Sequence, residues 1–190
     1  GQNIPEPATL FDDYSNRQPY AGKAWMKIRK ISNYFPSDDF DQAMGSDPVY
    51  QRMSATEQRT FFDSYKTRNA EYERLKESGE LNRKKALLRY AYQRFIKDYL
   101  RCVDGIDENV GRLLDFLDEH RLSQNTIVVY ASDQSYFLGD HGWAEKRWMY
   151  EEALAMPLII RWPERIAPMT RVDAMVQNID YAPTLLDAAG

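Results

Sequence analysis

The sequence has few of the residues on which several kinds of site and targeting signal depend. Cys102 is the single cysteine of the 190 residues. It cannot form an internal disulfide and has no metal ligands near it in the sequence, so we expect it to lie in a helix core. No charged start leads into a long apolar run, so the chain as given predicts neither a signal peptide nor a membrane-spanning helix.

Long blocks of like charge are missing as well. The 29 acidic and 25 basic residues give a formal net charge of -4 and are interspersed. The chain therefore lacks the basic footprint of a nucleic-acid-binding protein, and we expect no nucleic-acid partner. The densest basic clusters, residues 27–30 and 83–85, are short, and we expect them to be solvated helix faces.

The composition is that of a folded protein. With 43% hydrophobic and 13% aromatic residues, the chain can bury a core as one domain or as a large part of a bigger one. Residues 1–50 contain several prolines and show no sustained period, which predicts an extended connection with short helical turns.

A helical region is predicted over residues 54–120. Ser54 and Glu57 have the spacing of a capping box, and Gly79 is a suitable stop for the helix that follows. Charged residues such as Arg94 and Lys97 fill one face of the next helix, and we expect them to be structural. Apolar residues recur on its other face at intervals of three and four, which predicts a stripe packed against a core: Tyr92, Phe95, Tyr99, Val103, Ile106, Val110, Leu113 and Leu117.

Residues 126–190 have an α/β pattern. Residues 126–131 form a short β-branched run, which predicts a strand buried on both faces. Residues 156–163 predict a second buried strand and residues 172–176 a weaker third. Asp180 can cap a final helix that ends at Gly190. A long helix that feeds a buried strand is half of a βαβ unit, so we predict an α/β class.

Polar residues follow the first predicted strand at once. In open α/β sheets, ligands bind beyond the carboxyl ends of strands, where Asp133 and Gln134 emerge. Their carboxylate and amide oxygens are hard donors, which suit calcium or magnesium. A turn that follows a strand and is closed by an aspartate side chain is the structural alternative for these two residues.

A histidine and a lysine come next. His141 lies between two glycines, and Asp140 beside it could orient or protonate the imidazole for contact with an anion or for acid catalysis. Lys146 precedes a predicted helix over about residues 147–154, and the ammonium group and the helix start together would attract an anion. Taken alone, Lys146 is better explained as a solvated loop lysine, and the case for an anion site comes from the whole set of residues.

These motifs occur in a recognisable order. The chain resembles the part of a type I sulfatase that lies downstream of the nucleophile, and it is similar to bacterial polysaccharide sulfatases and to iduronate- or glucosamine-sulfatase-like enzymes. The resemblance covers nearly the whole chain. It rests on the Asp133-Gln134 pair, Leu-Gly-Asp-His-Gly at 138–142, Lys146, Met-Tyr-Glu-Glu at 149–152, and the segments 7–15, 99–107, 156–163 and 180–187.

The resemblance implies a partial alkaline-phosphatase-like three-layer fold, with a central buried sheet flanked by helices. It implies hydrolysis of sulfate esters, on sulfated carbohydrate, by a calcium ion and a formylglycine. Carried over residue by residue, Asp133 and Gln134 would bind the metal, Lys146 would hold the sulfate, and His141 would line the substrate pocket. It also suggests a periplasmic or secreted protein. A metal and fixed cations suit the charge that develops in this reaction.

Two departures from the family pattern affect the interpretation. Ser135 stands where glycine is usual after the metal-binding pair. No Cys-or-Ser-x-Pro-x-Arg motif occurs in the sequence, and we find neither the first pair of metal-binding aspartates nor the upstream lysine and histidine that contact the sulfate. We therefore interpret the chain as a fragment of a sulfatase catalytic domain that is inactive by itself.

Two other functions stay open at this point. A phosphatase, phosphodiesterase or phosphoethanolamine transferase of the same superfamily would use similar site chemistry. A non-catalytic carbohydrate-binding or interaction protein could have kept the scaffold without the chemistry.

Overall fold

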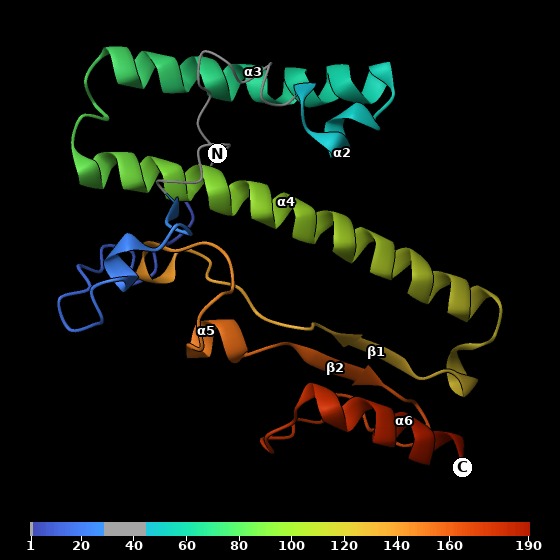
Figure 1. Ribbon diagram of the computed structural model, residues 1–190. Helices are drawn as coiled ribbons and strands as arrows, with labels where there is room; N and C mark the ends of the chain where they lie inside the picture. The colour runs from blue at the N-terminus through green and yellow to red at the C-terminus, as the bar shows by residue number, and fades with distance from the viewer. Residues whose placement is uncertain (1, 29–44) are drawn as a thin grey trace. The chain divides into compact units, whose positions relative to one another are not determined.

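The computed structural model of the protein describes residues 2–28 and 45–190 (Figure 1). The chain forms two compact units, which we call unit 1 (Gly1–Asp104 and Tyr136–Glu145) and unit 2 (Gly105–Ser135 and Lys146–Gly190). The residues 29–44 of the predicted extended connection lie outside the described part of the chain.

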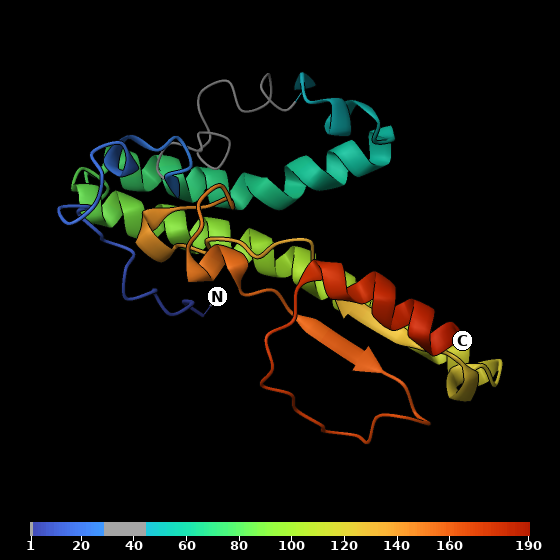
Figure 2. The same cartoon turned by 60° about the horizontal axis from the view of Figure 1, so that its bottom comes forward.

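Unit 1 is built around two helices, α3 (Ala55–Glu77) and the part of α4 (Lys84–Glu119) that ends at Asp104. They run antiparallel and side by side in both views (Figures 1 and 2). The predicted capping box is confirmed: Glu57 accepts from the Ser54 N–H at 2.7 Å, while the Ser54 hydroxyl accepts from the Glu57 N–H. Gly79, just beyond the helix end, has φ +77°, a conformation that glycine adopts without strain.

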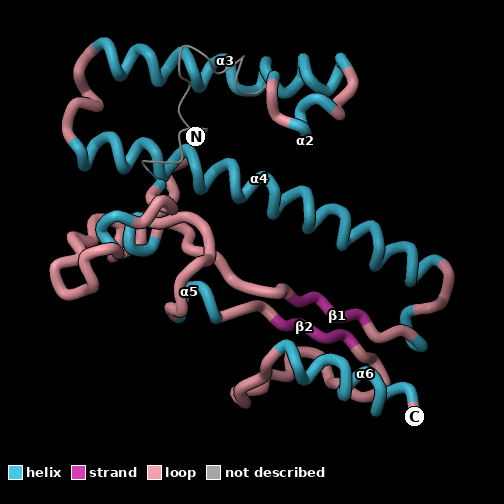
Figure 3. The backbone as a smooth tube through the Cα atoms, viewed as in Figure 1, coloured by secondary structure: helices cyan, strands magenta, loops and turns pink. Residues whose placement is uncertain are grey.

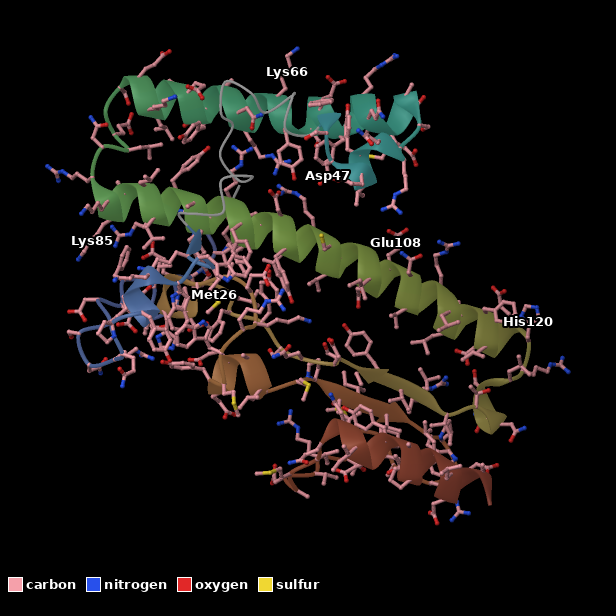
Figure 4. The ribbon with its side chains drawn as sticks, in the orientation of Figure 1. Met26, Asp47, Lys66, Lys85, Glu108 and His120 are labelled. Carbon is pink, nitrogen blue, oxygen red and sulfur yellow. The ribbon has the colours of Figure 1, made fainter. Side chains whose placement is uncertain are left out.

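The core of unit 1 unites segments that are far apart in sequence. The N-terminal segment forms turns, including η1 (Ala21–Lys23), and it precedes the short helix α2 (Pro48–Gln51). It contributes Leu10, Met26 and Ile28, all at most 1% exposed, and Met26 is labelled in Figure 4. The cluster of buried residues combines Leu10, Ile28, Ala91, Tyr92, Phe95, Ile96 and Ala144.

The predicted solvation of Lys27 is wrong, whereas the predicted structural role of Arg94 is confirmed. Lys27 is buried, because its strand-like backbone pairs with Trp143 and its ammonium group donates to the Gly22 carbonyl above the Tyr14 ring. Arg94, expected on the charged face of α4, is 6% exposed and donates to the side chain of Asn69 in α3.

The apolar stripe of α4 is only partly buried. Tyr92, Phe95 and Leu117 are buried as expected, whereas Ile106 and Leu113 are 49% and 53% exposed. Cys102 is exposed too, so its predicted place in a helix core is wrong. The spacing of apolar residues at intervals of three and four predicted the helix correctly. Among the described residues, however, no neighbouring element covers the stripe at Ile106 and Leu113.

Unit 2 contains a two-stranded antiparallel sheet of β1 (Val128–Ala131) and β2 (Leu158–Arg161), the strands drawn in magenta in Figure 3. Val128 lies opposite Arg161, and Ala131 opposite Leu158. Helices and paired strands together agree with the predicted α/β class. Burial of β1 on both faces is wrong, because Val129 and Tyr130, whose side chains lie on opposite faces, are 39% and 40% exposed.

The rest of unit 2 is a set of short elements. They are η4 (Ser123–Asn125), α5 (Glu151–Leu154), η6 (Asn178–Asp180) and α6 (Tyr181–Ala189). The predicted third strand at residues 172–176 is wrong, since this segment is irregular. Asp180 precedes α6, but its carboxylate accepts from the Gln177 N–H and leaves the helix start uncapped. No helix in residues 2–28 and 45–190 is both long and apolar enough to span a membrane.

Candidate functional site

The turn after β1 places three of the predicted site residues together in unit 2. The Ser132 hydroxyl donates to the Gln134 carbonyl at 2.7 Å and closes a tight turn where the strand ends at Ala131. The side chain of Asp133 then points into solvent and is 83% exposed. The structure thus contains the turn expected as the structural alternative, closed by serine rather than by aspartate.

Lys146 comes back to this turn from 13 residues further along the chain. Its ammonium nitrogen lies 3.5 Å from a carboxylate oxygen of Asp133, and its carbonyl accepts from the side-chain amide of Gln134 at 2.9 Å. The two contacts fix both ends of the lysine against the Asp133-Gln134 pair. The Asn178 side chain also donates to the Asp133 carbonyl at 3.0 Å.

Asn178 was missed by the sequence reasoning. It lies in η6, 45 residues beyond Asp133, and no local pattern links the two positions. Its contact ties the segment before α6 to the end of β1. This adds a second fixed point to the turn that carries Asp133.

The helix predicted over about residues 147–154 is shorter than expected. Only Glu151–Leu154 are helical, and the helix starts five residues after Lys146. A single turn has little dipole to offer, so positive potential at this place comes from the ammonium group of Lys146.

The donors at the turn fit part of a calcium site. The Asp133 carboxylate is accessible, and because the Gln134 amide nitrogen is engaged with Lys146, its oxygen is left as an acceptor. Calcium takes six to eight oxygen ligands, and two residues supply only some of them. Across the described ranges, no group of three or more histidine, cysteine and carboxylate side chains could hold a metal. A complete site needs further ligands.

Ser135 is compatible with this turn. Its N–H donates to the Ala153 carbonyl at 3.1 Å, and it is not among the residues with positive φ. A glycine is therefore not required here for conformational reasons. The departure from the family pattern changes the side chain without demanding a different backbone path.

His141 belongs to unit 1, where it is buried in η5 (Asp140–Gly142) at 5% exposure. Its backbone is left-handed, with φ 56°, between Gly139 and Gly142 at φ 106° and 67°. For a residue other than glycine this conformation is strained and persists only where the surroundings hold it. The Tyr14 hydroxyl donates to the His141 carbonyl, and the Thr9 hydroxyl accepts from its N–H.

The carboxylate partner of the His141 ring is Asp12, and the predicted role of Asp140 is wrong. Nδ1 of His141 lies 2.9 Å from an Asp12 oxygen and 3.2 Å from an Arg17 nitrogen. Asp140 accepts from the Thr9 hydroxyl at 3.2 Å instead. The left-handed turn directs the imidazole away from its sequence neighbour and toward the N-terminal segment.

The polar surroundings of Asp12 stabilise its charged form. Burial raises the pKa of this carboxyl, but the N–H of Tyr14, the ring of His141 and the guanidinium of Arg17 together hold the pKa below its usual value. The Asp12 to Arg17 ion pair has a distance of 2.9 Å. Asp12 and Arg17 were not found as partners of His141 by sequence reasoning, since 129 residues separate Asp12 from the histidine.

Comparison with known proteins links this chain to sulfatases. A family model described as N-sulphoglucosamine sulphohydrolase, C-terminal, matches residues 139–190. Over 98% of its length the chain is 42% identical to an N-acetylglucosamine-6-O-sulfatase of Bacteroides thetaiotaomicron, of which it covers 34%. Over nearly its whole length the chain is thus similar to type I sulfatases, and the predicted resemblance is confirmed.

Other sulfatases give the same result over shorter stretches. The iduronate 2-sulfatase of Mus musculus is 38% identical over 41% of this chain and 14% of its own length. A solved structure of the protein BT4656, in complex with its substrate D-glucosamine-2-N,6-O-disulfate, superposes with a TM-score of 0.85 at 40% identity. The match covers 99% of this chain and 39% of that one. The partial alkaline-phosphatase-like α/β fold is thereby confirmed, and the chain spans about a third of the N-acetylglucosamine-6-O-sulfatase.

Proposed function

We propose that this chain contributes to the hydrolysis of sulfate esters on a sulfated carbohydrate. The observation that carries the proposal is the convergence of Lys146, Asp133 and Gln134 at the end of β1, in a chain similar to sulfatases. The names of the relatives support a sugar substrate, because one acts on N-acetylglucosamine 6-sulfate by its name and another was solved with a glucosamine disulfate.

Lys146 is the proposed sulfate-binding residue. A sulfate ester and water give an alcohol and inorganic sulfate, and negative charge grows on the oxygens around sulfur as the S–O bond to the sugar breaks. A fixed ammonium group beside those oxygens stabilises the transition state more than the ground state. The side-chain amide of Gln134 holds the lysine backbone in place, and the ammonium group can exchange its contact with Asp133 for one with the sulfate.

Asp133 and Gln134 are also the proposed calcium ligands. Calcium, when bound, supplies a Lewis acid that polarises a sulfate oxygen. In the structure the Asp133 carboxylate lies 3.5 Å from the ammonium group of Lys146. When metal and sulfate bind, the carboxylate would contact the metal and the ammonium group would contact the sulfate. The formylglycine typical of the family, and the remaining metal ligands, have no counterpart in the sequence.

His141 is the proposed residue of the substrate-pocket wall. Its ring is held from one side by Asp12 and Arg17, and its backbone by Tyr14 and Thr9. The side chain is 6% exposed in this structure, so its assignment to the pocket wall rests on the resemblance to sulfatases. The periplasmic or secreted location inferred from the family resemblance stays a prediction.

The test compares two esters that differ in the transferred group. We expect the protein expressed from the complete reading frame that encodes these residues to release sulfate from N-acetylglucosamine 6-sulfate. Phosphate release from N-acetylglucosamine 6-phosphate should be far slower, and a calcium chelator should abolish the sulfate release. The 190-residue chain by itself should release none, because it has no nucleophile motif.

Each alternative function gives a different result in this experiment. Faster release of phosphate than of sulfate would favour the phosphatase, phosphodiesterase or transferase interpretation. Saccharide binding without release of either anion would favour a carbohydrate-binding protein. Substantial sulfate release by the 190 residues alone would contradict the assignment of the nucleophile to residues outside this sequence.

A further inference from the structure

A second set of cations lies in unit 1, between α3 and α4. A cavity of about 440 Å³ is bordered there by Arg68 of α3 and by Arg94, Lys97 and Arg101 of α4. Glu71 is its one acidic border residue. Arg101 is 55% exposed, so the cavity can be reached from solvent. None of these residues belongs to the proposed sulfatase site.

The cations of this cavity outnumber the carboxylates beside them. Asp98 pairs with both Arg68 and Arg101 and is 14% exposed. Glu71 is already paired with Arg74 at 2.9 Å, outside the cavity border. For Lys97, the described residues provide neither an ion pair nor a hydrogen bond. Positive charge is therefore left over at the cavity.

Arg94 is the deepest of these cations. It is 6% exposed, and its terminal nitrogens donate to the Asn69 side chain and the Arg68 carbonyl, which are neutral acceptors. Its Nε is buried without a hydrogen-bond partner in the described part of the chain. A buried guanidinium without a carboxylate is costly, and an anion in the adjoining cavity would lower that cost.

We propose that this cavity binds a sulfate or carboxylate group of an acidic saccharide. Guanidinium groups form paired hydrogen bonds with such planar or tetrahedral anions, and Lys97 adds an ammonium group. Tyr90 borders the same cavity and offers an aromatic edge to a sugar ring. An overall charge of -4 disfavours a nucleic acid, whose phosphates would meet positive charge only at this one place.

This binding site does not rest on the proposed hydrolysis. The cavity would bind its anion even if the catalytic proposal were wrong.

The experiment is calorimetric titration of the protein with a heparin-derived tetrasaccharide at low and at physiological salt. The double variant Lys97→Ala/Arg101→Ala removes two partly exposed cations from the cavity border. The matched control, Arg59→Ala/Lys66→Ala, removes two exposed cations of α3 that do not border it. Lys66 points away from α4 in Figure 4. Circular dichroism should show both variants folded.

We expect the cavity variant to bind about tenfold more weakly and the control within about twofold of the parent. Equal losses in both would contradict a specific site, as would equally tight binding of an uncharged tetrasaccharide of N-acetylglucosamine. A single-stranded oligonucleotide that binds as tightly as the saccharide would also overturn the proposal. The loss caused by Lys97→Ala/Arg101→Ala should persist in a Lys146→Ala background; its disappearance there would assign the saccharide to the proposed sulfate site instead.

Discussion

The two units of the chain differ in how far their apolar side chains are buried. In unit 1, the N-terminal segment, α4 and residues 136–145 bury Met26, Phe137 and Trp143 completely. In unit 2, the strands and α6 leave Ile159 and Leu186 63% and 72% exposed. Unit 1 has a well-packed hydrophobic core, whereas unit 2 has exposed apolar surface that no other described residue covers.

The residues proposed to bind metal and sulfate therefore lie in a different unit from the well-packed core. The strained His141 and its polar partners belong to the well-packed unit 1, where backbone strain can be held. Asp133 and Lys146 lie in unit 2, on an exposed turn that begins where β1 ends. The stability of the chain and the proposed chemistry can therefore be disturbed by different substitutions.

The largest expected effect on stability comes from one pair of phenylalanines. Phe137→Ala empties a fully buried position in unit 1 and should lower the free energy of unfolding by about 3–5 kcal/mol. Phe116→Ala, at 50% exposure in unit 2, should cost about 1 kcal/mol or less. Urea denaturation followed by circular dichroism measures both. Similar losses for the two variants would show that the cores do not differ as described.

Alanine substitution at two glycines tests the same difference between the units through backbone conformation. At Gly139, with φ 106°, an added Cβ would lie 2.6 Å from the Tyr92 ring. Gly139→Ala should therefore lower the free energy of unfolding by about 2–4 kcal/mol. Gly111 lies within α4, where an added Cβ meets no atom within 4 Å. Gly111→Ala should raise stability by about 0.5–1 kcal/mol, since alanine favours the helix. Thermal denaturation measures the Tm of both variants, and a shift of both Tm values in the same direction would refute this prediction.

The smallest effect depends on pH and concerns Asp12. Because the folded state lowers the pKa of Asp12, its charged form stabilises the protein above the ordinary pKa near 3.8, and this contribution is lost as pH falls through the lowered value. Asp12→Asn should cost about 1–3 kcal/mol at pH 7. Its stability should fall less steeply than that of the parent below about pH 4. Urea titrations from pH 7 to 3 measure this, and Asp115→Asn, an exposed residue of α4, controls for net charge. Parallel curves for parent and Asp12→Asn would contradict the role of Asp12.

Local features of the fold could be predicted from the sequence because local interactions determine them. Ser54 and Glu57 cap α3 within one turn, and the period of three to four residues defines α4. A turn after β1 was the structural alternative considered for Asp133 and Gln134, and it forms, although Ser132 rather than Asp133 closes it. The burial of these elements could not be predicted, because it depends on which other segment packs against each face, as the exposed Ile106 and the buried Lys27 demonstrate.

The partners of the candidate site were predictable only in part. Asp133, Gln134 and Lys146 came from a motif order shared with sulfatases, and the structure brings them into contact. The ring of His141 pairs with Asp12 over a separation of 129 residues, which no spacing rule connects. The nearer Asp140 was the predicted partner, but its carboxylate accepts from the Thr9 hydroxyl instead.

The most direct test of the central claim is the rate of sulfate release by a lysine variant. In the protein expressed from the complete reading frame, Lys146→Ala should reduce kcat for N-acetylglucosamine 6-sulfate by about 10²–10³-fold, the usual effect of removing a group that stabilises transition-state charge. Lys66→Ala, which removes an exposed lysine of unit 1, should change kcat by less than about twofold. Sulfate release that is the same in both variants would contradict the assignment of Lys146, and with it the proposed site at the end of β1.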